Sequence, residues 1–83
     1  MPVVATVDGV KVVFYANEHP PPHFHVKYGE HIAVIDIETL NVVRGFLPVS
    51  KRRTILAWAE TRKAKLSAAF LQATSHERVE AIE

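Results

Sequence analysis

The segment HFHVKYGEHIAVIDI, residues 23–37, decides the fold of this chain. In its first six residues apolar and polar side chains alternate, so the aromatic and aliphatic groups share one face of a strand and the two histidines share the other. After a turn at Gly29 and Glu30, residues 31–37 form the most apolar stretch of the first half, which is typical of a central strand. The segment therefore predicts a hairpin that turns one face toward a core.

Strands are also expected on both sides of this hairpin. Residues 3–7 and 10–15 are rich in valine and flank Asp8-Gly9, a strong signal for a two-residue hairpin turn. Residues 17–22 must form a loop, because their three consecutive prolines cannot donate to a strand ladder. A fifth strand is expected at 42–46, and the short links between strands favour an antiparallel meander.

The second half of the chain reads as helix. From Val49 to about Ala73, apolar side chains recur at helical spacing and glycine and proline are absent. Pro48 suits the start of such a helix, with Ser50 as an alternative N-cap. We expect an α+β fold in which one long C-terminal helix packs on one face of a small antiparallel sheet of four to five strands. Residues 1–74 would form a single domain, and 75–83 a frayed tail or short extra turn.

Length and composition exclude several classes of protein. A chain of 83 residues is too short for a doubly wound nucleotide-binding sheet or a TIM barrel. Without cysteine it cannot form disulfides, zinc ribbons, iron–sulfur clusters or a thiol nucleophile. No apolar stretch approaches the length of a membrane span and no signal peptide opens the chain, so we expect a cytoplasmic protein that does not bind membranes.

Positive charge is concentrated in one part of the sequence. The formal net charge is +1, yet residues 48–66 alone carry +5. This excess is the pattern of an anionic partner such as RNA, or of a solvated helix face with ordinary ion pairs. Arg62 falls within the apolar stripe of the helix, so it either extends its charged end to water or pairs with a carboxylate of the sheet.

Three of the five histidines lie in the loop and strand between residues 17 and 26. His23 and His25 are two apart on a strand and point the same way, which is how a strand presents two metal ligands. Glu30 could add a carboxylate, so His23, His25 and Glu30 form a candidate metal site. The same histidines could instead hold the loop together, or act in proton transfer to RNA. The candidates for binding a partner or RNA are Asn17, Glu18, His19, His23, His25, Lys51, Arg52, Arg53 and Arg62.

The stretch FYANEHPPPHFHV, residues 14–26, and the helical stretch AWAE, residues 57–60, resemble the domain of unknown function 4160 family. The likeness extends over roughly residues 1–72. It implies a small prokaryotic protein encoded beside a second small protein, an arrangement similar to toxin–antitoxin operons. The resemblance carries no established catalytic residue.

Together these observations lead to two hypotheses on function. The first is a cytoplasmic interaction module, one component of a toxin–antitoxin-like pair, that uses no cofactor. It would bind the small protein of the neighbouring gene through the open sheet face or residues 17–22, with RNA as a further target and a homodimer as a further use of that face. The alternative is a metal-binding domain or small metal-dependent enzyme that holds a divalent transition metal with its His-x-His strand.

Overall fold

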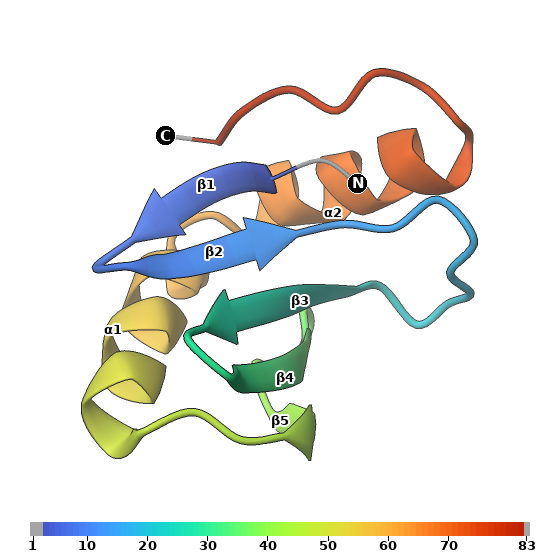
Figure 1. Ribbon diagram of the computed structural model, residues 1–83. Coiled ribbons are helices and arrows are strands. Elements are labelled where there is room, and N and C mark those ends of the chain that lie inside the picture. Colours follow the sequence, from blue (N-terminus) through green and yellow to red (C-terminus); the bar gives the residue numbers. More distant parts are fainter. Residues whose placement is uncertain (1–2, 83) are drawn as a thin grey trace.

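The structure, a computed structural model, describes residues 3–82 and contains a five-stranded antiparallel sheet with two helices (Figure 1). The strands lie side by side in chain order, which confirms the α+β class and the expected meander. The elements are β1 (Val3–Val7), β2 (Val10–Val13), β3 (His23–Tyr28), β4 (His31–Asp36), β5 (Val42–Gly45), α1 (Val49–Glu60) and α2 (Lys63–Thr74).

The β1–β2 turn has the geometry that its sequence predicts. Asp8 and Gly9 both have positive φ angles, of 50° and 81°. Two successive left-handed residues define the type I′ turn, whose twist matches that of the strands it joins. The turn sets Thr6 opposite Lys11 and Val7 opposite Val10, and so fixes the register of the first hairpin.

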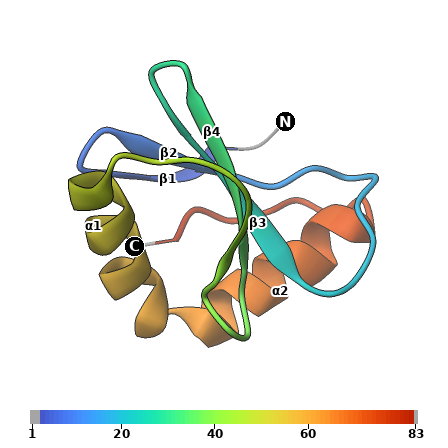
Figure 2. The same cartoon turned by 90° about the horizontal axis from the view of Figure 1, so that it is seen from below.

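Both helices cover the same face of the sheet (Figure 2). Alternation along β3 places Phe24 and Val26 on this face, where both side chains are completely buried. The helices contribute an apolar stripe that packs against them. The main members of this core are Val12, Phe14, Phe24, Val26, Ala33, Ile35, Ile37, Leu47, Ile55, Leu66 and Phe70.

The expectation of one long helix is wrong, because the helical region is bent into two. A straight helix over residues 49–74 would be about 39 Å long, whereas the longest dimension of the molecule is 32 Å. At the bend the Arg62 backbone N–H donates to the carbonyl of Ala59, and the Arg62 guanidinium donates to the carbonyl of Trp58 at 2.9 Å. The bend lets both segments keep their apolar side chains on the sheet. Within residues 3–82, neither helix has the length and apolar character that crossing a membrane requires.

The segment after α2 returns to the sheet. His76 adopts a left-handed conformation, and the N–H groups of His76 and Glu77 donate to Ala73 and Gln72. This is the Schellman arrangement that ends many helices. Further on, the N–H of Ile82 donates to the Val4 carbonyl at 2.8 Å, and the Ile82 side chain is buried in the core. The hydrogen bond of Ile82 thus joins the end of this segment to β1, and the turn at His76 directly follows α2.

Candidate functional site

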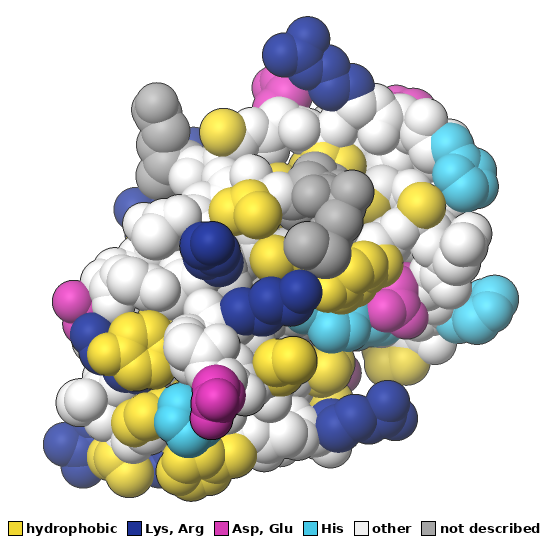
Figure 3. Space-filling model, in the orientation of Figure 1, with side chains coloured by type: hydrophobic (Ala, Val, Ile, Leu, Met, Phe, Trp, Pro, Cys, Tyr) yellow, Lys and Arg dark blue, Asp and Glu magenta, His cyan; other side chains and the backbone are white. Residues whose placement is uncertain are grey.

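The histidines of β3 alternate along the strand with the buried Phe24 and Val26. Figure 3 shows histidine side chains, in cyan, at the surface of this view, some of them next to acidic side chains. Since Phe24 and Val26 point into the core, His23 and His25 must point to the other side. Their rings lie side by side, with centroids 5.4 Å apart. Tyr15 meets the His25 ring edge-on at 4.6 Å, and Phe70 lies 5.3 Å from the His23 ring. Aromatic neighbours therefore restrict both imidazoles.

Glu18 completes this cluster from the loop that precedes β3. Its two carboxylate oxygens each lie 3.4 Å from a histidine Nε2, one at His23 and the other at His25. The side chains of the two histidines are only 14% and 16% exposed, and that of Glu18 is 31% exposed. The proline-rich loop folds the chain back so that Glu18 faces the strand. These three residues are the group within residues 3–82 that could hold a metal ion.

A second contact fixes the ring of His23. Its Nδ1 lies 2.8 Å from the carbonyl oxygen of Pro21. A carbonyl oxygen only accepts, so Nδ1 must carry the proton that it donates. In the neutral ring the Nε2 atom then presents a lone pair toward the carboxylate of Glu18.

The charge state of His25 follows from its surroundings. Burial lowers the pKa of the His25 imidazole below its ordinary value. Glu18 acts in the opposite direction but is outweighed, and His23, Lys27 and Arg44 add to the decrease. At neutral pH His25 is therefore an uncharged ring with a lone pair, the form that ligates metals and accepts protons.

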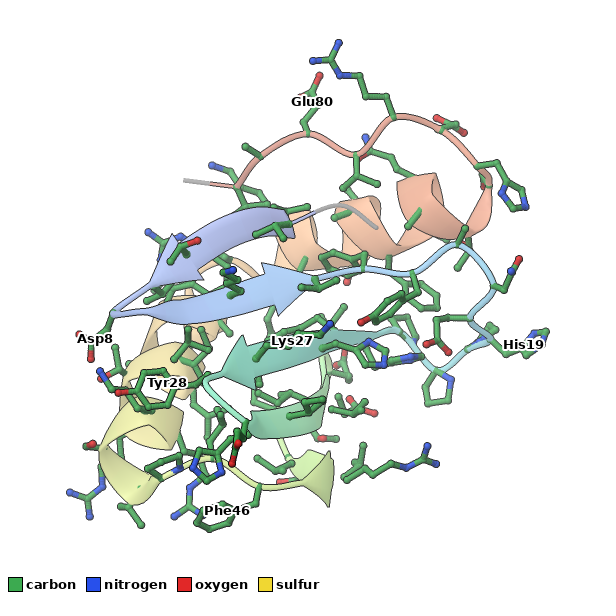
Figure 4. The ribbon with its side chains drawn as sticks, viewed as in Figure 1. Asp8, His19, Lys27, Tyr28, Phe46 and Glu80 are labelled. Atoms are coloured by element: carbon green, nitrogen blue, oxygen red, sulfur yellow. The ribbon has the colours of Figure 1, made fainter. Side chains whose placement is uncertain are left out.

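A pocket of about 340 Å³ opens beside the three residues. Figure 4 shows the imidazole rings of this face between the labelled Lys27 and His19. Arg44 on β5 lies across the pocket, in a row in which His25 pairs with Val34 and Val34 pairs with Arg44. Asp36 closes a further side, with one carboxylate oxygen accepting the Thr39 N–H at 2.9 Å. The lining residues are Glu18, His19, Pro21, His23, His25, Val34, Asp36, Val43 and Arg44.

The structure places some of the residues expected at a site beside the pocket and the others away from it. His19 lines the pocket with Glu18, His23 and His25, and Asn17 is exposed in the same loop. Glu30 lies in the turn at the opposite end of the β3–β4 hairpin, so it is not the carboxylate of the cluster. Glu18 takes that place, because loop length and not strand spacing brings the acid to the histidines.

The basic residues of the helices lie away from this pocket. The Lys51 ammonium contacts the Asp8 carboxylate at 3.0 Å and the Asp8 carbonyl at 2.9 Å. The hydrogen bond that the Lys51 ammonium donates to the Asp8 carboxylate raises the pKa of Lys51, and the ammonium also lies 4.8 Å from the Tyr28 ring centroid. Lys51 thus ties α1 to the β1–β2 turn, at the end of the molecule away from His19 (Figure 4).

Of the other three cations, Arg62 caps the last turn of α1 and lies 5.1 Å from the Trp58 ring centroid. Arg52 is half-buried and Arg53 is exposed, both at the start of α1, and neither lines the pocket. The cation that does line it is Arg44, which the sequence analysis missed. Its sequence carried no local signal, because Arg44 reaches the row of His25 only through the register of β5 on β4 and of β4 on β3.

Comparisons with known proteins identify the family of this chain. No curated protein and no solved structure matches it. The family described as Domain of unknown function (DUF4160) matches residues 9–70. This range runs from the β1–β2 turn into α2 and contains the whole histidine cluster and Arg44. The chain therefore belongs to the DUF4160 family, the family that its histidine- and proline-rich motif resembles.

Proposed function

We propose that this protein is a small cytoplasmic interaction module, one component of a toxin–antitoxin-like pair in a prokaryote, and that its open sheet face binds the cognate small protein. The observation that carries the proposal is the composition of this face. The pocket holds two carboxylates, one guanidinium and three imidazoles, and exposed apolar side chains lie next to it. Protein interfaces combine such apolar contacts with a few convergent polar groups.

The apolar part of this surface follows the β4–β5 edge. Val43 lines the pocket, and Ile32 and Phe46 lie further along the same edge, joined by a hydrogen bond from the Phe46 N–H to the Ile32 carbonyl. All three side chains are largely exposed. Phe46 marks the lower end of this edge in Figure 4. Aromatic residues and arginine are enriched at protein interfaces, which Phe46 and Arg44 fit, and the two aliphatic side chains add apolar area beside them.

A standard interface would use a modest part of the protein surface. The protein exposes 5113 Å² in total, and such an interface covers about 800 Å² of each partner. A homodimer through the same face is the alternative use of this surface, and sedimentation of the chain alone distinguishes the two.

Co-expression with the product of the neighbouring gene tests the proposal. The two proteins should co-purify, and Arg44→Glu should weaken the complex at least tenfold, since it reverses a charge within the contact surface. Arg53→Glu is the matched control, because it makes the same change on exposed helix surface away from the pocket, and it should leave the affinity within threefold. Failure to form a complex, or equal effects of both variants, would refute the proposal.

A growth assay extends this test to the role of the chain. Expression alone should inhibit growth if the chain is the toxin member, and co-expression of its partner should restore growth. If Arg44→Glu abolishes inhibition but retains the complex, the pocket acts on a target other than the partner. RNA is then the first target to test, because guanidinium and imidazole groups bind phosphate oxygens.

A further inference from the structure

We propose that Glu18, His23 and His25 bind one divalent transition metal ion, with zinc as the reference metal, and that its remaining coordination position faces the pocket. The proposal is independent of partner binding. It assigns the carboxylate to Glu18 of the loop, whereas strand spacing points to Glu30. Two imidazoles and one carboxylate are a donor set suited to zinc and neighbouring transition metals, and unsuited to magnesium or calcium.

The spacing of the donor atoms fits coordination better than direct hydrogen bonding. Each histidine Nε2 lies 3.4 Å from an oxygen of Glu18. Charge-assisted N–H···O hydrogen bonds are about 2.7–2.9 Å long, so these contacts are too long to be good ones. In a tetrahedral zinc site with bonds of about 2.0–2.2 Å, neighbouring ligand atoms are about 3.4 Å apart. One donor atom from each residue lies within 4.8 Å of the others, so the three side chains are close enough to converge on one ion.

The surroundings of the donors are also those of a metal site. The Nδ1–H of His23 donates to the Pro21 carbonyl at 2.8 Å, and such an outer contact orients the Nε2 lone pair of histidine ligands. Tyr15 and Phe70 hold the two rings from either side. The site is thus held in place by the loop, the strand and α2 before any ion binds.

The charge of the pocket changes sign when the ion binds. With neutral histidines, its two carboxylates and one guanidinium give a formal net charge of −1. A divalent cation raises this to +1. Arg44 and the open coordination position then face the same cavity, so the group that the bound ion would accept is an anion, such as a carboxylate or phosphate oxygen.

Zinc titration into chelator-treated protein, measured by calorimetry, tests the proposal, and the absorption spectrum of bound cobalt(II) reports the coordination geometry. The wild type should bind one ion per chain. Glu18→Gln and His25→Gln should each reduce the affinity by about 100-fold or more, since loss of an outer-shell partner alone costs about 10–100-fold. Glu30→Gln is the matched control and should bind like the wild type. Circular dichroism of each metal-free variant shows whether it is folded.

Two results would overturn the assignment. The first is a folded wild type that binds neither zinc, cobalt(II), nickel nor iron(II) at millimolar concentration. The second is a folded Glu18→Gln variant with unchanged affinity, or an equal loss in Glu30→Gln. Co-purification with chelator-treated protein distinguishes the metal site from the binding of the partner protein. A complex that forms without metal contradicts neither the metal site nor the protein interface.

Discussion

Gly45 offers the sharpest test of how the pocket is built. It ends β5 with a φ angle of +79°, a left-handed conformation that L side chains rarely adopt. A Cβ atom at this position would overlap the carbonyl oxygen of Ile32 and lie 2.9 Å from the Cα of Ala33. These atoms belong to the backbone of β4, which cannot rotate away. The substitution Gly45→Ala must therefore push β5 off its neighbouring strand, and Arg44 moves with it.

Gly29 supplies a control that separates the two causes of destabilisation. Its φ angle is also positive, at +59°, but an added Cβ would meet nothing within 4 Å. Gly29→Ala should cost only the left-handed strain, about 1 kcal/mol. Gly45→Ala adds an overpacking term of about 1–3 kcal/mol, for a total of about 2–4 kcal/mol. A chain of this length has about 4–12 kcal/mol of stability, so the difference is large enough to measure.

Urea unfolding followed by circular dichroism measures both variants. The midpoint should fall for each, and further for Gly45→Ala, with similar slopes if unfolding stays two-state. Affinity for the partner protein should decrease in Gly45→Ala and remain in Gly29→Ala, because only the former displaces Arg44. Surface substitutions change the free energy of unfolding by about 0.5 kcal/mol. If the free energies of unfolding of the two alanine variants differ by less than about this amount, β5 does not approach β4 as closely at Gly45 as the structure shows.

Three further predictions concern the rest of the fold. Ile82→Ala should destabilise the protein by about 2–4 kcal/mol in urea, because it empties a buried position; an effect below about 0.5 kcal/mol would mean that the C-terminal segment is detached. Lys51→Met should lower the urea midpoint, whereas Arg53→Met should not, and equal midpoints would contradict a structural role for the Lys51 contact with Asp8. In the presence of a chelator, the free energy of unfolding should decrease as the pH is lowered through 6.5. The pKa of His25 is lower in the folded than in the unfolded state, so the unfolded chain takes up the proton first. Thermal melts of His25→Gln should show a weaker pH dependence, and an equal dependence would exclude His25 as its source.

The strands were predictable because their signals are local. Alternation over residues 23–28, the Asp8-Gly9 turn and the three prolines each act within a few residues, and the observed β1 and β3 have the expected bounds. The bend between α1 and α2 has no such signal, since neither glycine nor proline occurs there. With the bend, both helical segments bury apolar side chains in the same core as the sheet.

The candidate site was also predictable only where its signals are local. Spacing along one strand placed His23 and His25 on one face, which the structure confirms. The choice between Glu18 and Glu30 was beyond local reasoning, because both acids are close to the histidines in sequence and only the path of the loop separates them. Arg44 reaches the pocket through pairing of β5 with β4, a contact between segments that no periodicity links to His25.

The amino-acid sequence by itself determined the α+β class, the order of the strands and the side of the sheet on which the two imidazoles stand. These features depend on side-chain alternation and on turn residues, which act on the nearest neighbours in the chain. Only the tertiary structure decided which carboxylate meets the imidazoles, which cation faces them and where the helix bends. Those outcomes depend on loop path, strand pairing and the size of the core, and they are settled only when distant segments pack against one another.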